Sequence, residues 1–400
     1  MNLPIKILNF KAQIAFLIIS LNMAQYISVG FFSESLAAIL RQDGLSLEKI
    51  GAVYFIGLFY GFRFLWAPFV EFAVAKMGGV YKNFIVVILT LMIISLGITS
   101  FLNVRENLGF ILIMAGLLGF LSATSAIASS ALIIKISTPQ NLAGANSLGA
   151  SGNFIGHVLG TGVTLIIYAN FGWIASTLFL VFLTLIALFM IITFKELPRE
   201  LEKSQNHVNF KNMAMFFKDK KFWLSVLMLQ GVGVCMSFGL INPILVDSGR
   251  GLDEVGKIVH IYGLCGVLLG SVIASYLINK FGSIKTIILV TLIQAAGILT
   301  LLLPILGYTN FIVLVLVCQI CFAVYTVGAV SVSTMIMRKA TKHPVSECAL
   351  QSSISMLFQY ISFALGFVIA SFVGYKATVV FSSIICIGVF FYILKFKKFI

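Results

Sequence analysis

Long apolar runs recur along the whole chain, and this feature constrains its fold more than any other. The chain has 400 residues, of which 60% are hydrophobic and only 10% are charged. Soluble domains carry about 25% charged residues, and a soluble fold of this length cannot bury so many apolar side chains. The runs are about 20 residues long, the length that an α-helix needs to cross a bilayer. The sequence therefore predicts an all-α integral membrane protein, because the weakly alternating segments of a transmembrane barrel are absent from it.

Twelve such runs predict twelve transmembrane helices. The first six cover residues 12–34, 47–70, 83–102, 108–134, 142–168 and 172–194. The second six cover residues 222–246, 255–278, 284–306, 310–337, 345–371 and 377–394. No small-residue cleavage site follows the first run, so we predict a retained span and not a signal peptide. The expected organisation is an N-terminal six-helix half at 1–194, a polar cytoplasmic linker at 195–221 and a C-terminal six-helix half at 222–400.

The net charge of +14 reports topology and not a nucleic-acid partner. If the N-terminus is cytoplasmic, most of the 27 Lys and Arg fall in cytoplasmic segments, as the positive-inside rule requires. Both termini are then predicted to be cytoplasmic, with the cations facing anionic lipid. Of the six cysteines, Cys318 and Cys321 have the spacing of a redox or metal pair. They lack a second ligand pair, so we interpret them as packing residues and expect no metal.

The chain repeats itself across the linker. Gly-Leu-Ser-Leu-Glu-Lys-Ile-Gly at 44–51 corresponds to Gly-Leu-Asp-Glu-Val-Gly at 251–256, and Phe-Gly-Trp at 171–173 corresponds to Val-Gly-Tyr at 373–375. The end of the fourth run, at 130–135, corresponds to the end of the tenth, at 333–338. Two parallel six-helix halves around an axis along the membrane normal describe the major facilitator architecture, in which ligands bind near the midplane and the halves rock. The repeat predicts this fold and a transport function.

Polar side chains inside the apolar runs are the candidates for a substrate cavity. For each amide the alternative is a hydrogen bond between helices with no ligand contact, and for His157 it is a packing role. The candidate substrate-binding residues are Asn22, Gln25, Arg63, Asn153, His157, Gln230, Asn242, Gln351 and Ser355.

Arg63 is the most informative of these residues, because a cation inside a span costs roughly 2.5–3.5 kcal/mol even on the lenient insertion scale. Counted from Leu47 at 1.5 Å per residue, it lies about 24 Å along a core of roughly 30 Å, in the cytoplasmic third. Two interpretations stay open. The guanidinium binds an anionic group of the substrate with its fork of donors, or the side chain snorkels to the interface beside Trp66.

Two acids are candidates for proton coupling, Glu34 near the outer end of the first span and Glu347 at the start of the eleventh. The alternatives are a solvated helix-end carboxylate for Glu34 and a role at the helix N-terminus for Glu347. The loops after the second and eighth spans are expected to hold an inward gate, and residues 279–285 resemble the major facilitator loop pattern without its usual acid. The candidate gating residues are Glu71, Lys76, Asn279, Lys280 and Lys285.

The run Arg63-Phe-Leu-Trp-Ala-Pro68, followed by Glu71, resembles the signature of AmpG-like permeases. That group includes muropeptide permeases, acetyl-CoA transporters and one-component siderophore importers of the RhtX/FptX type. Residues 31–44 and 346–352 look most like the siderophore branch. The chain departs from the group at Gln25-Tyr26-Ile27, where Gly and Pro are usual, at Arg63, often Lys, and at Glu71, often Asp.

This resemblance implies a bacterial inner-membrane secondary transporter that imports a ferric siderophore or a similar polar small molecule, driven by protons. It would function as a monomer in the lipid bilayer. No nucleotide-binding motif is present, and no cofactor is expected. A muropeptide or drug permease is the alternative within the same class. A membrane enzyme or receptor is the alternative from another class, but an enzyme would need a nucleophile–base or metal constellation, and the intramembrane titratable groups are scattered along the sequence.

Overall fold

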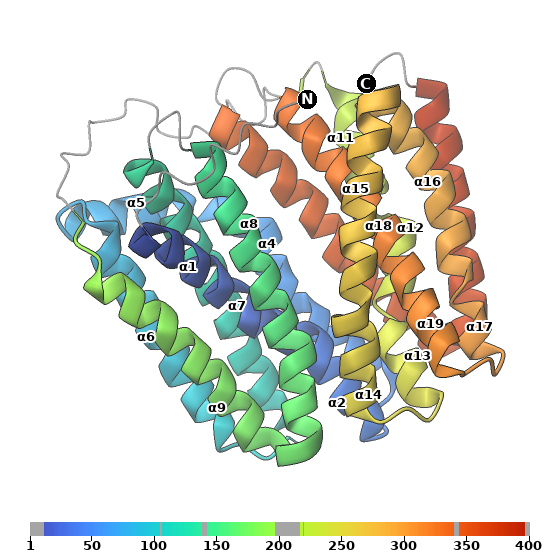
Figure 1. The fold of residues 1–400 in the computed structure, drawn as a ribbon, viewed down its shortest axis with the longest axis horizontal. Helices are drawn as coiled ribbons and strands as arrows, with labels where there is room; N and C mark the ends of the chain where they lie inside the picture. The colour runs from blue at the N-terminus through green and yellow to red at the C-terminus, as the bar shows by residue number, and fades with distance from the viewer. Residues whose placement is uncertain are drawn as a thin grey trace. The chain divides into compact units, whose positions relative to one another are not determined.

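The computed structural model describes residues 12–104, 106–137, 142–196, 217–218, 220–339 and 344–396, and all regular structure in these ranges is helical (Figure 1). Most of the predicted linker at 195–221 and both ends of the chain lie outside these residues. Within them, nine helices are long and apolar enough to span a membrane, and a tenth candidate is a pair of helices joined by a bend. The predicted all-α membrane class is confirmed.

The first part of the chain forms helices that follow the predicted spans. Two single turns of π-helix, η1 and η4, interrupt the α-helices of this part, and η2 and η3 are short 3-10 helices. The elements are α1 (Ala12–Gly30), η1 (Phe31–Ser35), α2 (Leu36–Gln42), α3 (Leu47–Gly51), η2 (Ala52–Gly57), α4 (Leu58–Phe62), η3 (Arg63–Leu65), α5 (Ala67–Lys76), α6 (Tyr81–Ser100), α7 (Leu108–Ile136), α8 (Leu142–Val158), η4 (Leu159–Val163) and α9 (Thr164–Thr193).

The second part of the chain is built in the same way and contains a longer π-helical segment, η5. Its elements are α11 (Lys221–Leu229), α12 (Val232–Phe238), α13 (Ile241–Asp247), α14 (Leu252–Val255), η5 (Gly256–Tyr262), α15 (Gly263–Phe281), α16 (Ser283–Leu299), α17 (Leu302–Ile305), α18 (Phe311–Lys339) and α19 (Pro344–Phe396).

Two continuous helical segments are too long to be single spans. Leu148–Thr193 has 46 residues and Glu347–Phe396 has 50, whereas about 20 residues cross a bilayer. Each contains one glycine with a φ of 78°, Gly172 and Gly374 respectively, a conformation that residues with a Cβ avoid. The chain leaves the helical path at these glycines, so each segment supplies two spans. With the bent pair counted as one, the described helices account for all twelve predicted spans.

The second span is not the straight helix that we expected at 47–70. Leu47–Leu65 and Ala67–Lys76 meet at an angle of 66°. Pro68 explains the bend, because it lies in the first turn of α5, has no N–H for the carbonyl of Phe64, and has a ring that clashes with a continuing helix. Arg63 therefore lies in the last turn before the bend.

Contacts divide the described chain into two compact units. The first contains residues 12–35 and 65–196, and the second contains residues 36–64 and 217–396. Inside the membrane-spanning part, the division falls at the π-turn η1 and at the bend after Arg63. The predicted halves at 1–194 and 222–400 stay a prediction beside this division, because the units are defined by contacts and not by the repeat.

A stripe of glycines on α8 and η4 packs against α1 in the first unit. Gly152, Gly156 and Gly160 recur every fourth residue, as the sequence showed. A Cβ on Gly156 would lie 2.5 Å from the carbonyl oxygen of Met23, and one on Gly160 would overlap the carbonyl of Ile27. Only glycine allows the two backbones to approach this closely, as in GxxxG helix pairs. The stripe therefore fixes the register of α1 on α8.

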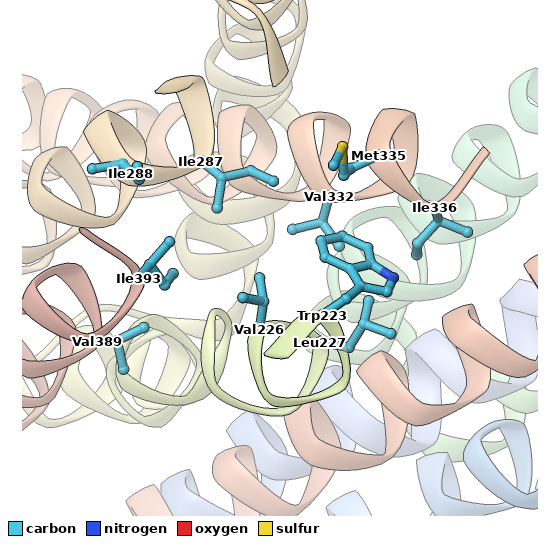
Figure 2. Close-up of a cluster of buried hydrophobic side chains, with 10 residues drawn as sticks. All are labelled: Trp223, Val226, Leu227, Ile287, Ile288, Val332, Met335, Ile336, Val389 and Ile393. Atoms are coloured by element: carbon cyan, nitrogen blue, oxygen red, sulfur yellow. The ribbon is translucent and has the colours of Figure 1, made fainter. Parts of the chain in front are cut away.

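The second unit has an apolar core shared by four helices, which Figure 2 shows around Trp223. The indole N–H of Trp223 donates a 2.5 Å hydrogen bond to Oε1 of Gln351, so the polar atom of this ring is satisfied. The core residues come from α11, α16, α18 and α19. They are Trp223, Val226, Leu227, Ile287, Ile288, Val332, Met335, Ile336, Val389 and Ile393.

Residues 36–64 pack against α19 in the same unit. Tyr54 stacks on Phe363 with ring centroids 5.3 Å apart and lies 5.2 Å from the ring of Phe367. Gly57 allows the close approach, because a Cβ there would overlap the ring of Tyr360. Residues 36–64 thus pack on α19 through the ring of Tyr54 and through the space that Gly57 leaves for Tyr360.

We expect Gly156→Ala to lower stability by about 1–3 kcal/mol, the usual cost of forcing a methyl group into a close-packed contact. Gly97→Ala is the matched control, because Gly97 also lies inside a helix but a Cβ there would meet nothing within 4 Å. Thermal unfolding of the purified proteins in detergent measures both. Equal melting temperatures for the two variants would contradict the close α1–α8 contact.

Candidate transport site

A carboxyl group and an imidazole meet in the first unit. Glu34 lies in the π-turn η1, and His157 lies at the end of α8, just before the π-turn η4. Nδ1 of His157 is 3.9 Å from Oε1 of Glu34, and both side chains are partly buried. The hydroxyl of Ser35 donates a 2.9 Å hydrogen bond to the carbonyl of Thr161, which ties the two π-turns together. π-turns are frequent at functional sites, and this pair can hold or pass a proton.

The other candidates of the first unit lie on α1 and α8. Gln25 is buried, with 4% of its surface exposed, and Asn22 donates from Nδ2 to the carbonyl of Ile18 at 2.8 Å. Oδ1 of Asn153 is buried and has no hydrogen-bond partner in the part of the chain that the structure describes. An acceptor in that state is available to water or to a ligand. Of the three amides, Asn153 is the one whose geometry most favours a ligand contact.

Arg63 belongs to the second unit and is partly exposed. Its guanidinium carbon lies 6.0 Å from the centre of the Tyr60 ring, the outer limit of a cation–π contact. Trp66, which we considered as an interface anchor, donates its indole N–H to Oγ1 of Thr124 at 3.2 Å and is held by α7. The bend leaves the Arg63 side chain at the end of a helical segment.

Gln230 faces another buried amide in the second unit. Its Nε2 donates to Oε1 of Gln294 at 3.2 Å, and Nε2 of Gln294 donates to the carbonyl of Val324 at 3.2 Å. Gly328 makes room for the pair, because a Cβ there would overlap the Gln294 amide and lie 2.8 Å from Nε2 of Gln230. This is the geometry of a hydrogen bond between helices, the alternative that we raised for every amide.

Ser355 belongs to a chain of polar groups that links α18 and α19. Tyr325 donates from its hydroxyl to Oε1 of Gln359 at 3.0 Å, and Nε2 of Gln359 donates to Oγ of Ser355 at 3.1 Å. Phe238 stacks on Tyr325 with ring centroids 4.8 Å apart. Tyr325 and Gln359 are only partly buried. The candidate set omitted Tyr325, although a tyrosine inside an apolar run is the kind of amphipathic residue that marks such a site.

The remaining candidates of the second unit are buried, hydrogen bonded within the protein or placed at a helix N-terminus. Gln351 is fully buried, accepts the bond from Trp223, and donates to the carbonyls of Glu347 at 3.0 Å and Ile336 at 3.4 Å. Its amide therefore ties α11, α18 and α19 together. Asn242 is buried in α13. Glu347 lies in the first turn of α19, where a carboxylate is favoured by the helix dipole.

The predicted gating residues all have exposed side chains, and all but Glu71, which is in the middle of α5, lie at helix ends. Nζ of Lys76 lies 4.6 Å from the centre of the Phe72 ring, and Nζ of Lys280 lies 3.2 Å from the hydroxyl of Tyr276. These residues are Glu71 and Lys76 on α5, Asn279 and Lys280 on α15, and Lys285 on α16.

An ion pair that we did not predict lies in the first unit, at the end that the charge pattern places in the cytoplasm. Glu196 contacts Nζ of Lys135 at 2.5 Å, and it accepts the backbone N–H of Lys82 at 2.7 Å at the start of α6. Nζ of Lys82 in turn donates to the carbonyls of Ile192 and Phe194 at 2.7 Å. A helix N-terminus favours the carboxylate. In the sequence, this pair was indicated by an acid, Glu196, that directly follows the predicted span at 172–194 and lies among cations.

A second pair that we did not predict lies in the second unit. Nε of Arg41 donates to Oδ1 of Asp247 at 2.8 Å, and its NH2 group donates to Oδ2 at 2.6 Å, a bidentate arrangement. Tyr375 donates its hydroxyl to Oδ2 of the same carboxylate at 2.6 Å. Arg41 and Asp247 are 206 positions apart. Each lies at the end of the first span of its repeat, in Ala12–Gln42 and Lys221–Asp247 respectively. In the sequence, this pair was indicated by opposite charges at equivalent positions of the two repeats.

The family model of the Major Facilitator Superfamily matches residues 14–367. The chain belongs to this superfamily. The function class is therefore secondary transport and not enzymatic catalysis, as the repeat predicted. The superfamily also confirms a multi-pass membrane protein with a small-molecule substrate, whereas the predicted inner membrane and cytoplasmic termini stay predictions.

Curated relatives are distant. The chain is 20% identical to the anhydromuropeptide permease of Escherichia coli over 72% of this chain and 60% of that one. It is 23% identical to a putative transporter AmpG 1 of Rickettsia bellii over 90% of this chain and 92% of that one. An uncharacterized protein of Haemophilus influenzae is 24% identical over 66% of this chain, and the match spans 65% of the relative. The AmpG-like part of the resemblance is thus supported, whereas none of these relatives is named as a siderophore importer.

Solved structures show the same fold at low sequence identity. The nucleoside transporter NupG has a TM-score of 0.67 at 14% identity, covering 97% of this chain and 100% of that one. A POT family transporter in complex with 5-aminolevulinic acid has a TM-score of 0.70 at 12% identity, covering 97% of this chain and 96% of that one. The predicted major facilitator fold is confirmed.

We expect Asp247→Asn to lower stability by about 1–2 kcal/mol, more than the median exposed pair, because three donors converge on this carboxylate. Asp253→Asn is the control, since Asp253 makes a single exposed contact with Lys257 at 3.3 Å and should change stability by less than about 0.5 kcal/mol. Restoration of stability in an Arg41→Asp, Asp247→Arg double variant would support the pair. Equal melting temperatures for Asp247→Asn and the wild type would contradict it.

Proposed function

We propose that the chain is a proton-coupled importer of a polar small molecule of the muropeptide class. The observation that carries the substrate class is the hydrogen-bonded chain Tyr325–Gln359–Ser355, in which Tyr325 and Gln359 are partly exposed, with Phe238 stacked on Tyr325. Amides and hydroxyls recognise the hydroxyl and amide groups of a sugar–peptide, and aromatic rings pack on its apolar faces. The named AmpG-like relatives support the same class.

Coupling to protons is proposed to use Glu34 and His157. Imidazole is the side chain whose charge changes most readily near neutral pH, and a carboxyl group 3.9 Å away can exchange a proton with it directly or through one water. Acids and histidines inside membrane spans commonly form proton relays. The geometry thus favours Glu34 over Glu347 as the coupling acid.

The ferric siderophore that the sequence resemblance favoured stays a competing substrate. Its support is the motif similarity of residues 31–44 and 346–352. Both substrates present polar oxygen and nitrogen atoms, so the residues of the site do not separate them, and one experiment should compare them directly.

Purified protein in proteoliposomes with an inward proton gradient tests the function. We expect accumulation of a labelled anhydromuropeptide that an uncoupler abolishes, with no accumulation of a ferric siderophore. Liposomes without protein are the control. Accumulation of the siderophore alone would restore the sequence-based prediction, and transport of neither would remove both proposals.

We expect Glu34→Gln to abolish accumulation driven by the proton gradient while substrate exchange across the membrane persists, because exchange needs no net proton movement. Glu48→Gln replaces an exposed acid and is the matched control. Exchange is measured with labelled and unlabelled substrate on opposite sides. Loss of exchange together with accumulation would argue against a specific coupling role for Glu34.

We expect Arg63→Ala to lower uptake by roughly tenfold to a hundredfold at low substrate concentration, since a hydrogen bond to a charged group is worth about 1.5–3 kcal/mol. Arg63→Lys should be intermediate, because lysine keeps the charge and loses the fork. Uptake is normalised to the amount of protein in the membrane. Full uptake in Arg63→Ala would mean that the side chain only snorkels.

A further inference from the structure

Three serine hydroxyls on α7 are buried without a hydrogen-bond partner. Ser122, Ser125 and Ser129 have at most 1% of their surface exposed, and the structure gives their hydroxyls no partner among the residues it describes. Ser28 on α1 is in the same state. A hydroxyl that is shielded from solvent is normally bonded to protein or to ordered water, so these four groups require an explanation.

Other buried serines in the same unit satisfy themselves. Ser33 donates to the carbonyl of Val29 at 2.6 Å, and Ser95 donates to the carbonyl of Leu91 at 2.8 Å. This bond to the fourth residue back is available to any serine in a helix. The four hydroxyls without a described partner therefore depart from the pattern that Ser33 and Ser95 follow.

The hydroxyls of α7 lie on one face of that helix. At 100° per residue, Ser122, Ser125 and Ser129 fall within an arc of about 60°, directly beside Ile133. Ile133 packs against Ile18 of α1, so this face is turned toward α1. The first and fourth spans of this fold run in opposite directions, and counting from that contact places Ser28 level with Ser122.

Two amide side chains of α1, those of Gln25 and Asn22, extend this row of polar groups. Gln25 lies level with about Ser125, and Asn22 lies level with about Ser129, by the same count. The result is a row of neutral oxygen and nitrogen groups along α1 and α7 that also reaches α8, because the amide of Asn22 lies 3.3 Å from the position of a Cβ on Gly149. We call it the serine seam, and it consists of Asn22, Gln25, Ser28, Ser122, Ser125 and Ser129.

The serine seam itself carries no charged side chain, and Glu34 and His157 lie beyond its end. α1 and α9 contain no charged residue, and the only charge on α7 is Lys135 in its last turn. α8 contributes His157 and η1 contributes Glu34, while Tyr26 and Tyr168 are the tyrosines of α1 and α9. Ser28 precedes Glu34 by six positions, about 9 Å along the helix.

We propose that the serine seam holds a file of water molecules that carries protons between one side of the membrane and the Glu34–His157 pair. Hydroxyls and amides both donate and accept hydrogen bonds, so each can hand a water on to the next, and a polar site with two or more partners per water is one that stays hydrated. A cation site is less suited to the seam, because no carboxylate lies on it. The proposal rests on the proposed proton coupling.

The presence of water is tested without any substrate. The thiol of a Ser125→Cys variant, in lipid nanodiscs moved into D₂O, should exchange S–H for S–D within minutes, as followed by its infrared S–H band after subtraction of the wild-type spectrum. Ser95→Cys is the matched control at a hydroxyl bonded to its own helix, and it should exchange at least tenfold more slowly. Ser122→Cys serves if the first variant does not fold. Equally slow exchange at both positions would overturn the proposal.

The proton route is tested by transport. The double variant Ser122→Ala, Ser125→Ala should lose at least fivefold in accumulation driven by the proton gradient and keep substrate exchange. The control is Ser95→Ala, Ser100→Ala, which removes two hydroxyls bonded to their own helix. Unchanged accumulation, or equal loss of exchange, would overturn the route. If the wild type exchanges no substrate, the proposed function fails, and the thiol measurement still decides whether the seam is wet.

Discussion

Inside a bilayer a polar group must find its partner within the protein or in trapped water, and this constraint orders the whole molecule. Helices meet through glycine, because no hydrophobic force draws them together in lipid. In the first unit Gly156 brings α1 onto α8, and in the second unit a Cβ on Gly366 would overlap the carbonyl of Met236. Such contacts exclude lipid from the polar side chains nearby, so those side chains must form hydrogen bonds with one another or with trapped water.

The two units solve that constraint with different chemistry. The first brings a carboxyl group and an imidazole together beside its π-turns. The second satisfies its amides in pairs and chains, such as Gln230 with Gln294 and Tyr325 with Gln359. A division between proton handling and substrate recognition follows from this difference under the proposed function. It would let the chain change substrates by altering amides while keeping the coupling residues.

Much of the fold could be predicted from the sequence, because span length and hydropathy depend on the bilayer and not on detailed packing. The twelve spans, the repeat and the turns at Gly172 and Gly374 follow from local patterns. The bend after Arg63 was also encoded, in Pro68, but a hydropathy run does not show where a helix breaks. The site was harder: the Glu34–His157 contact depends on how α1 registers against α8, and two residues far apart in sequence carry no such information by themselves. Buried Gln351 and partly buried Gln359 look alike in a sequence, and only packing shows that Gln351 is hydrogen bonded to Trp223.

The seating of residues 36–64 on α19 has a consequence for how the protein is made. Gly57 lies against Tyr360, and the ribosome reaches Tyr360 roughly 15–60 s after Gly57 at about 5–20 residues per second. During that interval residues 36–64 are already in the membrane. Gly57 does not yet have Tyr360 to pack against. The second unit cannot close until the last helix pair is inserted, so lipid or the insertion machinery must cover that surface of residues 36–64 while translation finishes.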